Sequence, residues 1–415
     1  MLVEEAKRNL IDGILPFWIN LVDSEYGGFY GEVDYNLNVD KKADKGTILV
    51  SRIMWLFSQA YIVLGDEKYL DTAKCAYEYF HKYCYDSEYG GLYWSTTYDG
   101  KPSDTVKHTY TMSYGIYGLV SYYEASGDVS VLNEAARLYR FIEDNCTDDL
   151  GYKEEFDRFF NLKDNEKVSD ALASRGFYAP RTMNTLLHLL EAYTELYRAG
   201  KHSMTVAEND FNNYILGEIK DKVVSLLTTF VDKVYNKDKR RLEVFFDLDY
   251  NSLVDTQSYG HDIESAWLID YAVKVLRDNL GEDEITDELK GLFNRIACMT
   301  DDLRGSVYAR ALKTDHMISD VMEGNVNETR VWWVHAEAVN GFSKGYVEQP
   351  DHPEYKEAAL KVLKYIKCYF IDARSGEWFN ELDLNDKPVV KELAGPWKCP
   401  YHNGRMWLEL IKAGN

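Results

Sequence analysis

The sequence predicts an all-α fold, an (α/α)6 barrel of twelve helices with short β-hairpins on one rim. Three observations support this prediction. A turn followed by alternating aromatic and polar residues recurs six times, roughly 60 to 90 residues apart. Each interval has room for two helices, one apolar on almost every face and one with a charged stripe. The first helix lacks a predecessor and the last a successor, so six pairs form only if the chain's ends meet.

Each copy of the repeat predicts a short strand or hairpin, because its residues alternate in polarity directly after a turn signal. The six copies are YGGFYGEVDYNL from Tyr26, YGGLYWSTTYDG from Tyr89, LGYKEEFDRFFNL from Leu150, RRLEVFFDLDYN from Arg240, RGSVYARA from Arg304 and SGEWFNELDLND from Ser375.

The helix pairs follow the copies in a constant order. Residues 46–64 are apolar on nearly every face, which indicates a buried helix. Residues 67–84 place Lys74, Glu78 and Lys82 at i, i+4 spacing, which indicates a solvated stripe. The remaining predicted helices are 104–126 with 128–146, 178–199 with 205–235, 256–280 with 283–299, 327–346 with 353–371, and the terminal helices 2–21 and 401–413.

No Pro/Gly/Ser-rich linker interrupts this pattern, so residues 1–415 are predicted to form a single catalytic domain. The least regular stretch, 160–178, is expected to be a loop and is a candidate for a mobile lid.

The composition of the chain indicates which kinds of partner and which cellular compartment to expect. The formal charge of −22 disfavours nucleic acid and anionic membranes as partners. No run approaches the roughly 18 apolar residues of a membrane span, and the N-terminus lacks the pattern of a secretory signal. The six cysteines form no C-x-x-C pair, which fits a reducing compartment. We therefore expect a cytoplasmic protein, a monomer or weak homodimer.

Polar and aromatic side chains cluster near the start of every buried helix, directly after the rim hairpin. If six inner helices point their starts at one axis, these clusters form one pocket. The candidate residues are Arg52, His108 and Tyr110, Asn184 and His188, His261 and Glu264, Trp332, Trp333 and Glu337, and Trp397 and His402.

The spacing of these residues suggests proton-transfer chemistry on a sugar. Asn184 and His188 are i, i+4, and His261 and Glu264 are i, i+3, so each pair shares a helix face. A carboxylate beside a histidine favours the imidazolium and selects a tautomer. With 33 Tyr and 9 Trp, the chain is rich in rings that stack on pyranose faces.

Other kinds of site have weak or no support. There is no H-E-x-x-H motif and no pair of histidines at i, i+4, so no metal is predicted. GxGxxG, the P-loop and GxSxG are also absent, and no cofactor is expected.

Five segments resemble signature segments of the cellobiose 2-epimerase branch of the N-acylglucosamine 2-epimerase superfamily. They are LVSRIMWLFSQAY, DTVKHTY, SYGHDIESAWL, TRVWWVHAEAV and GPWKCPYHNGRM, which span the chain from its first helices to its last. The resemblance implies an (α/α)6 barrel and reversible C2 epimerisation of the reducing-end glucose of a β-1,4-linked disaccharide. Cellobiose would give glucosyl-mannose, and lactose would give epilactose.

The resemblance also implies roles for the candidate residues. His261 and His402 would act as acid and base on either face of C2, through a cis-enediolate. His188 and Arg52 would stabilise the developing oxyanion, and Glu264 would tune His261. The substrate-binding residues would be Tyr110, Asn184, Trp397 and one of Trp332 and Trp333.

Two positions depart from the family's pattern. The family commonly has Gln where His335 stands, so an extra histidine is expected near the pocket. In the segment from 304 to 330 a Glu is usual, whereas Arg310 aligns there and Glu323 is the alternative.

Four alternative functions remain at this point. An aldose–ketose isomerase or an N-acylglucosamine 2-epimerase would use the same fold. A glycoside hydrolase would need two carboxylates, for which Asp262, Glu264 and Glu337 are available. A non-catalytic sugar-binding protein would keep the tryptophans but would not need both His261 and His402.

Overall fold

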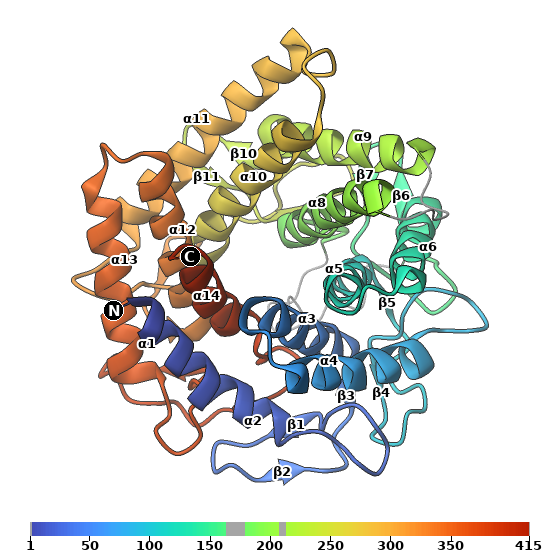
Figure 1. The fold of residues 1–415 in the computed structure, drawn as a ribbon. Helices are drawn as coiled ribbons and strands as arrows, with labels where there is room; N and C mark the ends of the chain where they lie inside the picture. Colours follow the sequence, from blue (N-terminus) through green and yellow to red (C-terminus); the bar gives the residue numbers. More distant parts are fainter. Residues whose placement is uncertain (1, 163–178, 207–212, 415) are drawn as a thin grey trace. The chain divides into compact units, whose positions relative to one another are not determined.

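The computed structural model describes residues 2–162, 179–206 and 213–414 and is mainly helical (Figure 1). The α-helices are α1 (Leu2–Asn9), α2 (Leu15–Ile19), α3 (Thr47–Leu64), α4 (Glu67–Tyr79), α5 (Thr109–Ser126), α6 (Val129–Asn145), α8 (Met183–Val206), α9 (Asn213–Thr229), α10 (Tyr259–Asn279), α11 (Asp287–Arg310), α12 (Trp332–Glu348), α13 (Pro353–Tyr365) and α14 (Tyr401–Lys412). Four π-helical turns, η1 (Leu10–Ile14), η2 (Phe80–Cys84), η3 (Phe230–Val234) and η4 (Ile366–Phe370), extend or join them.

The strands have two or three residues each. They are β1 (Glu32–Val33), β2 (Val39–Asp40), β3 (Lys45–Gly46), β4 (Ser95–Thr96), β5 (Lys107–His108), β6 (Thr147–Asp148), β7 (Gly151–Tyr152), β8 (Glu155–Phe156), β9 (Arg181–Thr182), β10 (Tyr235–Asn236), β11 (Arg241–Leu242), β12 (Phe245–Phe246), β13 (Thr256–Ser258), β14 (Asp320–Met322), β15 (Asn325–Asn327), β16 (Arg330–Val331) and β17 (Glu381–Leu382).

Within the described ranges, a helix is found at each of the twelve predicted places. The predicted helix 2–21 consists of α1, η1 and α2, and the π-helical turns complete three of the outer helices. Most of the predicted loop 160–178 lies outside the described residues.

The chain divides into two compact units. Unit 1 comprises Met1–Tyr178, Tyr369–Leu382 and Lys387–Asn415, and unit 2 comprises Ala179–Cys368 and Asp383–Asp386. In unit 1, α3 packs against α5 and α14, while α4, α6 and α1 pack on α3, α5 and α14 respectively (Figure 1). In unit 2, α10 packs against α8 and α12, while α9, α11 and α13 pack on α8, α10 and α12. Both units repeat the predicted order of an inner and an outer helix, and the single domain stays a prediction.

Most residues of α3 are buried, because α4, α5 and α14 pack against it. The expectation that no segment is apolar enough for a membrane span was wrong by length and composition, because the 18 residues of α3 pass that test. However, 72% of this helix is buried inside the protein, as expected for the core helix of a globular unit.

Strands, rather than a further helical turn, precede the inner helices, so the predicted starts at 104, 178, 256 and 327 were too early. Each such strand pairs antiparallel with the hairpin region of the next repeat: β3 with β4, β5 with β8, β9 with β12, and β13 with β14. This pairing connects the starts of α3, α5, α8 and α10 to the rim hairpins.

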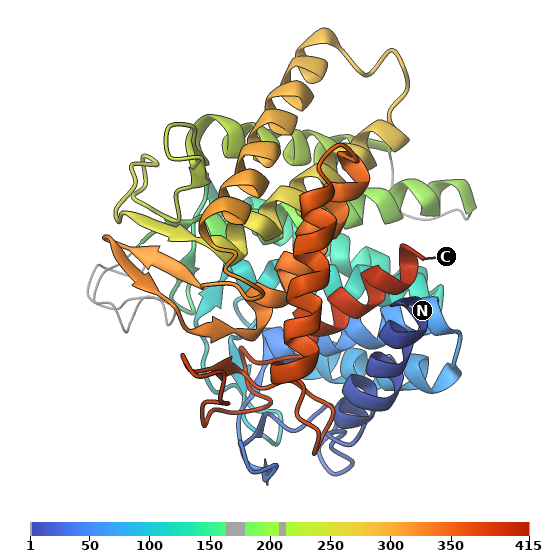
Figure 2. The ribbon, with the colours of Figure 1, turned by 90° about the vertical axis from the view of Figure 1, so that its left-hand side faces the viewer.

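The fifth predicted hairpin, from Arg304, was wrong. Residues 304–310 form the last turns of α11, because Ile296, Leu303 and Val307 continue its buried apolar stripe at helical spacing. The hairpin of this repeat lies further along, where β14 and β15 form a three-stranded sheet with β13; Figure 2 shows β14 and β15 as orange arrows.

Candidate active site

The predicted site residues lie in the first turns of inner helices, or just before them, in both units. Unit 1 contains Arg52, Tyr110, Trp397 and His402, and unit 2 contains Asn184, His188, His261, Glu264, Trp332 and Trp333.

In unit 1, Arg52 is a buried cation without a carboxylate partner among the described residues. Its Nη2 donates to Tyr110 Oη (2.8 Å) and its Nη1 to Cys399 Sγ (3.3 Å). The guanidinium lies 4.1 Å from the ring centre of Tyr114 and 5.0 Å from that of Tyr401. Within the described chain its Nε–H, also buried, has no hydrogen-bond partner. Ring faces and neutral acceptors only partly offset a buried charge, so this guanidinium is suited to stabilising an anion.

Trp397 is part of an aromatic surface that also includes a residue from the second hairpin. It is 43% exposed, and its ring centre lies 5.3 Å from that of Trp94 and 6.0 Å from that of Tyr110. Trp94 in turn lies 4.7 Å from the ring of His108, whose Nε2 is 3.5 Å from Glu155. An exposed ring such as that of Trp397 can stack on a pyranose.

His402 is the second residue of α14 and is 7% exposed. Its ring meets that of Tyr401 edge-on, with 4.8 Å between the centres. Asn403, the next residue, donates to the buried carboxylate of Glu377 (2.5 Å). These contacts hold the first turn of α14, which contains His402, in place.

In unit 2, His261 lies in the first turn of α10. Its Nδ1 is 2.8 Å from Ser258 Oγ, the hydroxyl of the residue that precedes the helix. Ser258 makes no side-chain capping bond to the helix, so its hydroxyl serves the histidine instead. The ring of Trp333 on α12 lies 4.7 Å from the imidazole, tilted by 47°. Of the two tryptophans, Trp333 is therefore the one beside the predicted acid/base, while Trp332 is only 3% exposed.

Gly260 allows this close approach. A Cβ at this position would come within 2.5 Å of the Trp333 ring and 2.9 Å of the Val334 side chain. Gly260→Ala is therefore expected to displace Trp333, raising KM about tenfold, or about 1.4 kcal/mol. Steady-state kinetics check this against Gly217→Ala, whose Cβ would meet nothing within 4 Å. An unchanged KM in Gly260→Ala would contradict the role of Trp333.

His188 on α8 is paired with Glu191, a carboxylate that was not among the predicted site residues. Its Nδ1 lies 2.9 Å from Glu191 Oε2, and both side chains are buried. A buried carboxylate at Nδ1 selects the Nδ1–H tautomer and favours the imidazolium. Asn184, one turn earlier, has a buried Oδ1 without a partner in the described chain, which suits it to accept a hydrogen bond from a hydroxyl.

The acidic residues near these helix starts are fully buried. Asp262 accepts from the Leu242 amide (3.0 Å) and Gln257 Nε2 (2.9 Å), and burial raises its pKa to about 7. Glu337 accepts from Trp267 Nε1 at 3.0 Å. Glu264 is 0% exposed, one helical turn beyond His261. Asp262 and Glu337 thus hold the scaffold, which does not favour the two-carboxylate arrangement of a glycoside hydrolase.

His335 was expected near the pocket, but it is a core residue. It is 0% exposed and stacks on Tyr365, with 5.4 Å between the ring centres. Its Nδ1–H donates to Val331 O (2.8 Å), and its Nε2 accepts from the Met317 amide (3.1 Å). Burial lowers its pKa to about 3, so the ring is neutral.

This neutral histidine is expected to make stability depend on pH. Unfolded histidine has a pKa near 6.5, so from there down to about 3 the unfolded chain binds the extra proton. Wild-type stability should therefore fall, relative to His335→Gln, by up to about 1.4 kcal/mol per pH unit below pH 6.5. Urea unfolding at pH 7.0, 6.0 and 5.0 measures this slope. Equal slopes for both proteins would contradict a neutral His335.

The other departure from the family's pattern lies on the rim. Arg310 Nη1 donates to Lys239 O (2.8 Å) and to Gln257 Oε1 (3.4 Å), so it joins two hairpin regions of unit 2. Glu323 is exposed at the β14–β15 turn, with a positive φ of 48°.

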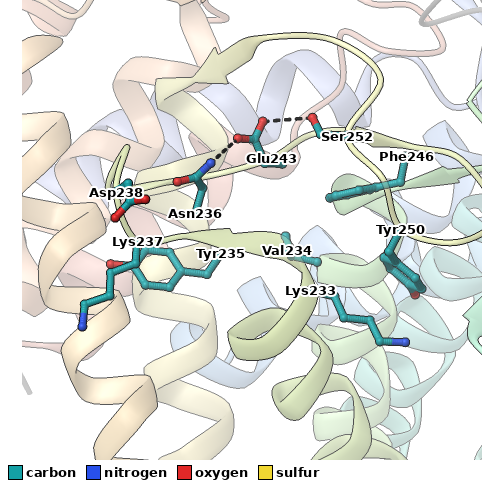
Figure 3. A pocket seen from close by; sticks show the side chains of 10 residues that line it. All are labelled: Lys233, Val234, Tyr235, Asn236, Lys237, Asp238, Glu243, Phe246, Tyr250 and Ser252. Atoms are coloured by element: carbon teal, nitrogen blue, oxygen red, sulfur yellow. Dashed lines mark hydrogen bonds between the residues drawn. The ribbon is translucent and has the colours of Figure 1, made fainter.

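A surface hollow of unit 2 contains none of the predicted site residues. It lies along η3, β10 and β11, where Glu243 accepts from Asn236 (2.8 Å) and Ser252 (3.1 Å) (Figure 3). Because no predicted site residue lines this hollow, we do not assign the active site to it.

Several residues of the two clusters were not predicted from the sequence, among them Tyr114 and Tyr401, which flank the Arg52 guanidinium. Glu191 stands at i+3 from His188, so helical spacing could have identified it. Trp94, Ser258 and Cys399 had no comparable signal, because their contacts with the site residues depend on tertiary packing or on the choice of a hydroxyl partner.

Comparison with known proteins connects both clusters to one family. Residues 28–404 match the family described as N-acylglucosamine 2-epimerase (GlcNAc 2-epimerase). The chain is 44% identical over 416 residues to the cellobiose 2-epimerase of Ruminococcus albus, covering 100% of this chain and 99% of that one.

Two solved structures extend the similarity to the fold. A sugar epimerase from a ruminal bacterium matches with a TM-score of 0.89 and 43% identity over 100% of both chains. The cellobiose 2-epimerase of Bacillus thermoamylovorans matches with a TM-score of 0.87 and 38% identity over 99% of both. These matches confirm the predicted (α/α)6 fold class.

Proposed function

This chain belongs to the N-acylglucosamine 2-epimerase family, and from that membership we infer that it is a cellobiose 2-epimerase. It inverts C2 of the reducing-end glucose of cellobiose, giving glucosyl-mannose. The observation that supports this function best is 43–44% identity to cellobiose 2-epimerases over 99–100% of the chain. Lactose, which has the same reducing-end glucose, is expected to give epilactose.

The reaction needs one proton to leave C2 and another to return on the opposite face. We propose that His261 and His402 are the two acid/base residues. One takes the C2 proton from the open-chain aldose and leaves a cis-enediolate, and the other donates a proton to the opposite face. His402 also assists ring opening. Ser258 supports this role for His261, because a hydroxyl at Nδ1 holds the ring in a fixed orientation.

The enediolate places negative charge on the oxygens of C1 and C2. Arg52 and His188 would stabilise that charge, and what supports this is their electrostatic environment. Arg52 is buried without a carboxylate partner in the described chain, and His188 has Glu191 at Nδ1, which favours the cationic ring. Glu264 would tune His261.

The sugar rings would be held by aromatic and amide side chains. Trp397 and Trp333 would stack on pyranose faces, since both are partly exposed and lie beside other candidate residues. Tyr110 and Asn184 would bind hydroxyl groups. Trp332 is too buried to serve as the platform.

A cytoplasmic location and a monomer or weak homodimer complete the proposal. Six free thiols support a reducing compartment.

Incubation with cellobiose in D₂O containing EDTA tests this function. We expect glucosyl-mannose with deuterium at C2, formed at the same rate as without EDTA. Free glucose would indicate hydrolysis, a ketose as sole product would indicate an isomerase, and no conversion would indicate a binding protein; each of these contradicts the proposal.

A further inference from the structure

Glu377, in the last hairpin region of unit 1, is a fully buried carboxylate that accepts four hydrogen bonds. Its Oε1 accepts from Lys398 Nζ (2.9 Å), Asn403 Nδ2 (2.5 Å) and the Trp378 amide (2.7 Å), and its Oε2 from Trp18 Nε1 (2.6 Å). Both Glu377 and Lys398 have side chains 0% exposed. A buried charge of this kind is kept only where its partners are well placed.

Two earlier repeats contain a related ion pair with a different acidic residue. Lys45, just before α3, binds Asp23 (2.7 Å), and Lys107, just before α5, binds Asp86 (3.0 Å). In both, the aspartate begins a tight turn that ends in two glycines. Each pair therefore links the turn to the start of an inner helix.

The backbone places Asp372 at the position of these aspartates. The amides of Asp23 and Asp86 donate to the carbonyls of Gly28 and Gly91, and the amide of Asp372 donates to the carbonyl of Glu377. Glu377 therefore occupies the position of the second glycine in the other two turns.

In the turn of the last repeat, a glutamate replaces the second glycine and becomes the partner of the buried lysine. Gly28 and Gly91 have positive φ, and a Cβ there would come within 2.6 Å of the Tyr79 ring and 3.0 Å of the Phe141 ring. Glu377 is not among the residues with positive φ, so it can bear a side chain. Lys398 pairs with that side chain, while Asp372 pairs with Arg374 (2.7 Å) instead.

The glutamate also makes a hydrogen bond to Asn403, the residue that follows His402. The carboxylate of Glu377 reaches Asn403 on α14 as well as Lys398 just before it, so it holds the segment on both sides of His402. We propose that Glu377 is a positioning residue that sets the orientation of His402. This inference rests on the proposed acid/base role of His402.

Glu377→Gln is expected to lower kcat about 10- to 100-fold with KM changed less than about threefold, because misplacing a reacting group by about 1 Å can cost about 10²-fold. Asn403→Ala keeps the buried ion pair between Glu377 and Lys398 and should likewise lower kcat much more than it changes KM. This variant tests the proposal even if Glu377→Gln does not fold. Asp23→Asn breaks the matched pair of the first repeat and should leave kcat within about threefold, measured well below its Tm.

A second measurement separates positioning from general damage to the fold. With the second acid/base misplaced, His261 still removes and returns the C2 proton on its own face. Solvent deuterium should then enter C2 of one epimer faster than C2 is inverted. The ratio of the exchange rate to the inversion rate should therefore rise at least fivefold in Glu377→Gln, Asn403→Ala and His402→Asn. It should not rise in Asp23→Asn. If His402→Asn is inactive in inversion while Glu377→Gln and Asn403→Ala keep wild-type kcat and ratio, the positioning role is wrong. If His402→Asn itself inverts C2 normally, the proposed function of His402 is wrong instead.

Discussion

His261→Asn and His402→Asn are each expected to lower kcat for epimerisation of cellobiose by about 10²–10⁴-fold, the contribution of a positioned acid or base. Neither change should unfold the protein, since asparagine is polar and smaller than histidine, and so fits both the half-buried position 261 and the buried position 402. Each variant loses proton transfer on one face of C2, so inversion should be affected in both reaction directions. Progress curves from cellobiose and from glucosyl-mannose measure this, with circular dichroism to verify the fold.

His352→Asn is the matched control for these variants. His352 is an exposed histidine that pairs with Glu354 at the start of α13, so its loss should leave kcat within about twofold of the wild-type value. Near-wild-type turnover in either His261→Asn or His402→Asn would contradict the two-histidine mechanism.

Arg52→Lys is expected to lower kcat by about 10²–10³-fold, as the loss of one oxyanion donor does in other enzymes. Lysine keeps the charge but lacks the planar guanidinium group. One ammonium cannot replace the two donors to Tyr110 and Cys399. It also cannot stack between the rings of Tyr114 and Tyr401. KM should change much less than kcat, because the charge on the enediolate develops only as the reaction proceeds.

Arg198→Lys provides the comparison for this substitution. Arg198 is a partly exposed arginine that binds Glu195 one turn earlier on α8, so kcat should stay within about twofold. If Arg52→Lys raised KM and left kcat unchanged, Arg52 would bind the ground state and not the enediolate.

Much of the helical architecture could be predicted because its signals are local. Apolar spacing identified twelve helices, and repetition identified their pairing. The boundaries were harder, since residues such as Lys107 and His108 continue a helical pattern in sequence but pair as a strand with Glu155 and Phe156. The prediction of the fifth hairpin was wrong because its residues have turn and alternation signals but form a helix, in which Leu303 and Val307 extend the buried stripe of α11.

The sequence by itself determined the order of inner and outer helices and the clustering of polar residues at the inner helix starts, since periodicity and turn signals involve neighbours along the chain. Only the tertiary structure decided that Trp333 and not Trp332 lies beside His261, and that His335 is a neutral core residue. It also decided that Glu377 replaces an aspartate as the partner of a buried lysine. The physical reason is that burial, pKa and hydrogen-bond partners depend on groups from other helices, whose approach no local pattern encodes.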